Sequence, residues 1–114
     1  MSCQAAVRHA GNVAIVDLSG SIALGGGAGL VRGTVRDLLG AGHKNILINL
    51  AGVNYMDSSG LAEMAGSYIT VANVGGCLRL VNASDKVSSL LQVTKLSTIL
   101  ITFADEESAL ASFR

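Results

Sequence analysis

The sequence predicts an α/β protein with a mixed, mostly parallel β-sheet of about four to five strands, packed with about four α-helices. Short segments rich in Val, Ile and Leu alternate with segments whose apolar residues recur at helical spacing, which is typical of βαβ units. Two apolar segments near the start are separated by little more than a Gly-Asn turn, which indicates an antiparallel hairpin at one edge. The chain has 114 residues, half of them hydrophobic, so we expect one domain over residues 1–114.

The first half of the chain predicts a hairpin, a helix and a buried strand. Residues 4–8 form a weaker strand and residues 13–19 (VAIVDLS) a stronger, β-branched one, on either side of the Gly11-Asn12 turn. From about residue 28 to 41 the apolar positions repeat as on one face of an amphipathic helix. Residues 45–50 (NILINL) are apolar on both alternating faces, which favours a strand covered on both sides.

The second half predicts two further strands and three helices. A helix begins near residue 58 and ends at Gly75-Gly76. Helical spacing assigns its core side to Leu61, Met64, Ala65, Tyr68, Ile69 and Ala72, and its opposite side to Gly60, Glu63, Ser67 and Thr70. The remaining elements are a strand over 77–82, a helix over 85 to about 94 capped by Ser84, a strand over 97–103 and a short helix over 105–113.

Charge and composition exclude several classes of function. Eight basic and eight acidic side chains cancel, so we expect no surface for nucleic acid or an anionic membrane. No apolar run approaches the ~18 residues of a membrane-spanning helix. The N-terminus lacks the apolar stretch of a secretory signal, so we expect the protein in the cytoplasm. The two cysteines match no metal-ligand spacing, and we expect neither a metal nor a cofactor.

The segment MDSSGL (residues 56–61) lies between the buried strand and the next helix, where ligands gather in open α/β sheets. Asp57 or Ser58 is placed to cap this helix. A catalytic serine is disfavoured, because neither Ser58 nor Ser59 stands in the G-x-S-x-G pattern of a nucleophile elbow. The glycine-rich segment at 25–29 offers backbone amides to a phosphate but lacks the Lys and Ser or Thr of a Walker loop. A nucleotide-binding protein or enzyme using this loop stays an alternative.

The chain resembles a STAS domain of the bacterial anti-sigma factor antagonist type over nearly its full length. The resemblance is carried by VAIVDLSG, KNILINLAGVNYMDSSGLAEM, CLRLVNAS and KVSSLLQVTKLSTILITFADEESAL, with DSSGL the most specific part. It implies the STAS fold and a protein that is a partner-binding switch and not an enzyme. In that family the unphosphorylated antagonist binds an anti-sigma factor, itself a serine kinase of the histidine-kinase-like ATPase fold, and so releases a sigma factor.

The resemblance also implies the position of the switch. The kinase phosphorylates the serine directly after the aspartate, which is Ser58 here, and a PP2C-type phosphatase restores the hydroxyl. The partner contacts expected around it are Asp57, Ser59, Gly60, Glu63, Ser67 and Thr70, with Ser21, Gly25 and Gly26 from the loop before the first helix. A STAS module in another partner-switching pathway, without a sigma factor, stays a second alternative.

Overall fold

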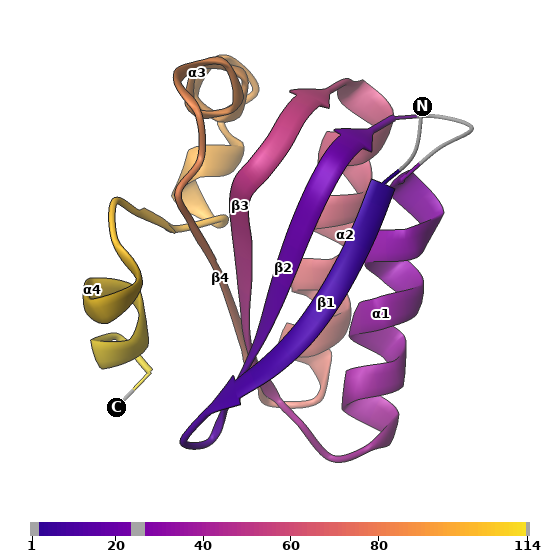
Figure 1. Ribbon diagram of the computed structural model, residues 1–114, viewed down its shortest axis with the longest axis vertical. Coiled ribbons are helices and arrows are strands. Elements are labelled where there is room, and N and C mark those ends of the chain that lie inside the picture. Colours follow the sequence, from indigo (N-terminus) through magenta and orange to yellow (C-terminus); the bar gives the residue numbers. More distant parts are fainter. Residues whose placement is uncertain (1–2, 24–26, 114) are drawn as a thin grey trace.

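The strands lie side by side in chain order, β1-β2-β3-β4-β5, in a computed structural model that describes residues 3–23 and 27–113 (Figure 1). They are β1 (Cys3–Ala10), β2 (Val13–Ile22), β3 (Asn45–Met56), β4 (Cys77–Val81) and β5 (Thr102–Phe103). β1 and β2 are antiparallel, whereas each later strand runs parallel to the one before it. The predicted mostly parallel sheet with an antiparallel edge is therefore confirmed.

The helices cover the two faces of this sheet unequally. They are α1 (Ala28–Gly40), α2 (Ser58–Asn73), α3 (Asp85–Val93) and α4 (Glu106–Ala111). Figure 1 shows α1 and α2 side by side on one face, and α4 on the other. Ile46 and Ile48 pack into the larger apolar core with α1 and α2, while Leu47 packs into a smaller core with Ala109 of α4. Successive side chains of a strand point to opposite faces, so β3 is covered on both sides, as its sequence predicts.

β2 and β3 are both longer than their apolar runs indicate. β2 extends to Ile22 and β3 to Met56, and these two end residues are paired with each other. Two register irregularities interrupt the pairing, after Asp17 and after Gly20. Each extension supplies hydrogen-bond partners for the other, so β3 continues until the residue directly before Asp57.

The predicted strand over 97–103 is wrong for most of its length. Residues Leu96–Thr98 form a 3-10 helix, and only Thr102 and Phe103 pair with β4. Leu100, between them, is fully buried in the larger core. Leu100 therefore packs into the core without alternating across a sheet, whereas Ile101 beside it is 47% exposed.

A polar cluster joins the first hairpin to α4. The Arg8 guanidinium donates to the carboxylate of Asp17, with Nε 2.7 Å from Oδ2, and to the carboxylate of Glu106. Asn49 Nδ2 also donates to Asp17 Oδ1, at 2.8 Å. Hydrogen bonds from Arg8 lower the pKa of Asp17 and of Glu106 below their usual values. The ion pairs therefore contribute stability when both carboxyl groups are ionised.

Replacing Arg8 by Met should destabilise the protein at neutral pH but hardly at all in acid. The three side chains are partly exposed, so the loss at pH 7 should be about 1 kcal/mol. Because folding lowers the carboxyl pKa values, this stability is fully present above the unfolded-state pKa of about 4 and is lost as the pH falls from there through the folded-state values. Thermal melts of both proteins at pH 7 and pH 3 test this. Arg36→Met is the control, since Arg36 has no ion pair with a described residue, and a difference independent of pH would contradict the assignment.

Candidate functional site

The start of α2 presents one serine hydroxyl to solvent. Asp57 is the N-cap: its Oδ1 accepts from the backbone N–H of Gly60 at 3.0 Å, and its carbonyl accepts from Leu61 at 3.0 Å. Ser58 is the first helical residue, is exposed, and makes no side-chain hydrogen bond with any described residue. The sequence predicts that either Asp57 or Ser58 caps α2, and in the structure Asp57 alone is the cap. Ser58 is therefore free of a capping duty.

The helix start is fixed against the end of β2. The backbone N–H of Asp57 donates to the carbonyl oxygen of Ile22 at 3.4 Å. A Cβ atom at Gly60 would lie 2.2 Å from that same oxygen, much closer than atoms of ordinary side chains approach. Only glycine allows α2 to come this near to β2. The contact sets the position of Ser58 at the edge of the sheet.

The orientation of α2 differs from the predicted one. Gly60 and Ser67 are buried, although the sequence places both on the polar side, whereas Ile69 is 54% exposed and Ala72 is exposed as well. The reason is α1, which packs along the side of α2 that carries the small residues and rotates the apolar stripe away from Ile69. Ser67 Oγ is buried there without a hydrogen-bond partner among the described residues.

The other predicted contact residues have mixed surroundings. Ser21 is buried, with Oγ 3.4 Å from Asn54 Oδ1, and it lies in β2 and not in the loop to which the sequence assigned it. Gly25 and Gly26 lie outside the described residues. Ser59 is half-buried, and Thr70 is half-buried with its hydroxyl donating to the carbonyl of Gly66 at 2.9 Å.

A strip of α2 beside Ser58 stays open to solvent. At 100° per residue, Ala62 and Ile69 lie within about 40° of Ser58 around the helix, so the strip has only small side chains between Ser58 and Ile69. Glu63 lies about 140° around the helix from Ser58, on the side facing α1, where its Oε2 is 3.6 Å from Nη1 of Arg32. Tyr55, just before the site, is 52% exposed. The sequence analysis did not assign Tyr55 and Ile69 to the site. The one feature that could have indicated them is their apolar character close to a polar motif.

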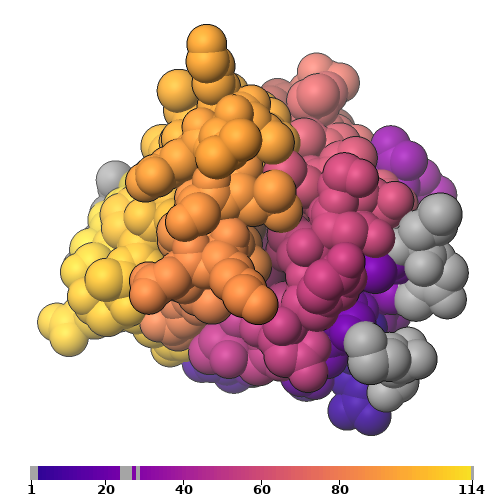
Figure 2. Space-filling model, turned by 90° about the horizontal axis from the view of Figure 1, so that it is seen from above, coloured from indigo at the N-terminus to yellow at the C-terminus, as the bar shows by residue number. Residues whose placement is uncertain are grey.

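The same end of the molecule includes the start of α3. In Figure 2, which looks onto this end, the end of β3 and the start of α2 (magenta to pink) lie beside α3 (orange). Met56 of β3 and Val87 of α3 line a common small hollow. α3 begins as predicted, with Ser84 Oγ accepting from the backbone N–H of Val87 at 3.2 Å. The site is therefore bordered by a second capped helix.

Replacing Asp57 by Ala should cost about 1 kcal/mol of stability, because the Gly60 amide loses its acceptor at the helix start. Asp57→Asn should retain most of the stability, since an amide oxygen can accept the same hydrogen bond. Urea unfolding of both variants measures the difference. Equal stability of Asp57→Ala and the unchanged protein would show that the cap contributes nothing.

Some other kinds of site have no support in the described part of the chain. Across residues 3–23 and 27–113, no three His, Cys, Asp or Glu side chains are grouped so that they could hold a metal ion. In the same ranges, the helices are all too short or too polar to cross a membrane.

Fold and site together define a small α/β module with an exposed serine hydroxyl at the start of α2. A family model described as "STAS domain" matches residues 4–109. The chain belongs to the STAS domain family.

Comparisons with individual proteins point in the same direction. The "Anti-sigma-B factor antagonist" of Bacillus subtilis (strain 168) is 36% identical over 63 residues, which are 55% of this chain and 58% of that protein. The chain thus matches little more than half of this relative. The crystal structure of an anti-sigma factor antagonist from Mycobacterium paratuberculosis has a TM-score of 0.87 at 20% identity, over 98% of this chain and 94% of that one. The Bacillus cell fate determinant SpoIIAA in its phosphorylated form has a TM-score of 0.74 at 21% identity, over 97% and 100%. At such identities the structures establish the shared fold.

Proposed function

We propose that this protein is a cytoplasmic anti-sigma factor antagonist, a regulatory protein and not an enzyme, which acts as a single STAS domain. The similarity to the Bacillus subtilis antagonist supports this function. The observation that carries it is the hydroxyl of Ser58, which is exposed, makes no hydrogen bond with a described residue, and stands at a helix start capped by its neighbour Asp57. A kinase can modify such a hydroxyl without first breaking a structural hydrogen bond.

Phosphorylation of Ser58 is the proposed off-switch. A phosphate adds about −1.5 to −2 charges at pH 7, directly beside the Asp57 carboxylate. The positive end of the α2 dipole offsets part of this within the free protein, by about 0.3 to 1 kcal/mol, so the fold tolerates the modification. A partner surface built to receive a hydroxyl does not tolerate it as well, because the dianion must be desolvated in the interface. A cost of ~4 kcal/mol there lowers affinity about a thousandfold.

The partner is an anti-sigma factor that is also a serine kinase of the histidine-kinase-like ATPase fold, and a PP2C-type phosphatase reverses the reaction. The surface that binds the kinase is the open strip of α2 from Ser58 to Ile69 together with Ser59, Glu63 and Tyr55. Its small side chains allow close approach of another backbone, and its exposed apolar groups add area that is stabilising to bury. Buried Ser67 and Ser21 act from behind this surface, as supports for α2 and the end of β2.

The assignment can be tested with a purified serine kinase of the anti-sigma type and a PP2C-type phosphatase from the same organism. The protein is incubated with the purified kinase and MgATP, and the peptide containing both serines is fragmented in a mass spectrometer. We expect one phosphate on Ser58, none in Ser58→Ala, and normal modification of Ser59→Ala. The phosphatase should then remove it. Phosphate on Ser59 alone would refute the residue assignment, and absence of both modification and binding would refute the proposed partner class.

A further inference from the structure

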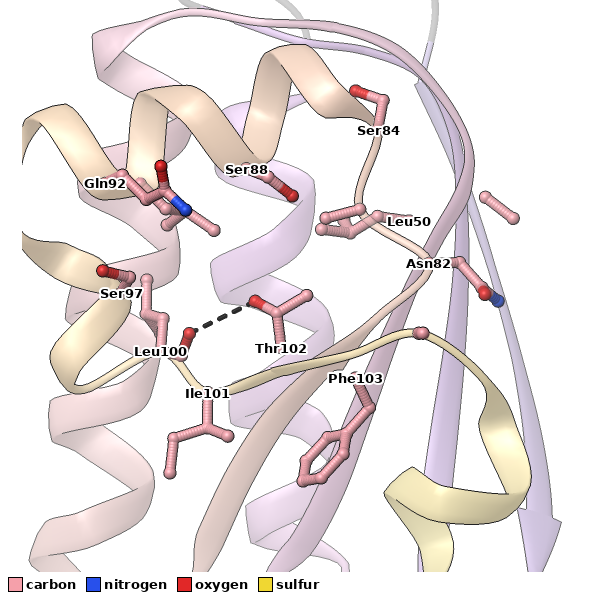
Figure 3. A pocket seen from close by; sticks show the side chains of 14 residues that line it. Leu50, Asn82, Ser84, Ser88, Gln92, Ser97, Leu100, Ile101, Thr102 and Phe103 are labelled. Carbon is pink, nitrogen blue, oxygen red and sulfur yellow. Dashed lines mark hydrogen bonds between the residues drawn. The ribbon is translucent and has the colours of Figure 1, made fainter.

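A groove away from Ser58 opens between α3 and the segment that leads into β5. Its volume is about 990 Å³. It exists because β4 pairs with β3 only as far as Asn49, after which β3 continues with β2 and leaves Leu50 facing the opening. In Figure 3, α3 forms the upper wall, and the chain from Ser97 to Phe103 forms the lower wall. The groove is thus walled by two segments that are close in sequence, while Leu50 of β3 joins them from a distant part of the chain.

The floor of this groove is apolar, and its walls carry polar groups with unused hydrogen-bonding capacity. Ala51, Ala83 and Phe103 supply accessible apolar surface, and Leu50, Leu91 and Leu100, each at most 2% exposed, lie directly behind it. Ser88 projects into the opening from α3, facing Thr102 on the lower wall (Figure 3). The Thr102 hydroxyl donates to the Leu100 carbonyl at 3.3 Å, whereas the Ser88 hydroxyl makes no hydrogen bond with a described residue.

The remaining lining residues fit the same chemistry. The side chains of Gln92 and Ser97 line the groove and also make no hydrogen bond within the described chain. None of the lining residues is charged, although 14% of the chain is Asp, Glu, Lys or Arg. An anion or cation placed here would lose hydration without gaining an ion pair, which is strongly unfavourable. The lining therefore selects against charged ligands such as nucleotides.

The volume lies within the ~300 to 1,000 Å³ that is typical of sites for small molecules. Such sites combine an apolar floor with a few polar groups that fix the orientation of the ligand. We propose that this groove is a binding site for an uncharged small molecule with a ring-sized apolar body and hydroxyl or carbonyl groups. The apolar body contacts the accessible apolar lining, which includes Ala83 and Phe103, and its polar groups bond to Ser88, Gln92 and Ser97. This activity is additional to partner switching and does not depend on Ser58.

Phenyl β-D-glucoside is a suitable probe, since it combines an uncharged aromatic ring with several hydroxyls. It is titrated into the ¹⁵N-labelled protein while backbone amide shifts are recorded, with phenyl phosphate and ATP titrated in parallel. We expect saturable shifts from the glucoside at residues of the groove, foremost Ser88 and Thr102, and none from the two anions.

Two neighbouring serines of α3 provide matched variants. Ser88→Tyr should weaken glucoside binding by at least about tenfold, because the added ring occupies the groove. Ser89→Tyr should leave it unchanged, since Ser89 lines a different hollow on the outer side of α3. Circular dichroism establishes that both variants fold. Absence of saturable glucoside shifts, stronger binding of either anion at these residues, or equal loss of binding in both variants would overturn the proposal.

Discussion

Ser58→Asp is expected to weaken binding of the anti-sigma kinase about a hundredfold, whereas Ser58→Ala should bind as tightly as the unchanged protein. The aspartate brings one negative charge into a surface that already contains Asp57 and Glu63. A charge buried in an interface without a partner costs about 3 kcal/mol, and 1.4 kcal/mol corresponds to a tenfold change in affinity. The phosphate carries nearly twice the charge, so the modified protein should be weaker still. Calorimetric titration with the purified kinase, in the absence of ATP, gives the three affinities.

A control variant must show whether affinity depends on where the negative charge is placed or only on the added net charge. Ser89→Asp makes the same change at another exposed helical serine, on the outer side of α3. It should leave affinity within about twofold, because charges separated by more than about 10 Å in water are largely screened. Equal affinities for Ser58→Asp and Ser58→Ala would exclude Ser58 from the interface. Equal losses for Ser58→Asp and Ser89→Asp would show that net charge alone weakens binding.

The location of the site could be predicted from the sequence, but the orientation of its helix could not. The junction was identifiable because MDSSGL stands between an apolar strand and a helical repeat, and caps and ligand sites occur at such junctions. The turn of α2 about its axis depends on α1, which the local pattern does not include. Ile69 was assigned to the core from its apolar side chain, yet burial of Ser67 and Gly60 against neighbouring elements leaves Ile69 outside.

The same reasoning explains which strands were predicted well. β4 and the first half of β3 are mostly apolar, and their Leu, Ile and Val side chains are buried, so composition alone identified them. The second half of β3 contains Gly52 and exposed polar residues, and it is a strand because the end of β2 pairs with it. Conversely, the apolar run that includes Leu100 has a single neighbouring strand, so most of it does not pair at all. A strand's pairing partners are distant in sequence, so local propensity predicts a strand poorly where the available partner decides whether it forms.

Gly60→Ala is expected to destabilise the protein by about 3 kcal/mol, although alanine is normally the better helix former. Gly60 does not have a positive φ, so its backbone conformation is open to any residue. The obstacle is steric: the new methyl group would lie 2.2 Å from the Ile22 carbonyl oxygen and 2.9 Å from Met56 Cγ. A backbone oxygen cannot turn aside as a flexible side chain can. The start of α2 would therefore have to move away from β2, and with it Asp57 and Ser58.

Gly66→Ala is the matched control within the same helix. A methyl group there would meet only the end of the Arg32 side chain, at 3.3 Å, and that guanidinium can shift. This variant should gain about 0.5 to 1 kcal/mol, because alanine loses less backbone entropy than glycine when a helix forms. Urea unfolding should therefore show that the same change from glycine to alanine lowers the free energy of unfolding at Gly60 and raises it at Gly66. If Gly60→Ala were as stable as Gly66→Ala, α2 would not be held against Ile22, and the position assigned to Ser58 would lose its structural basis.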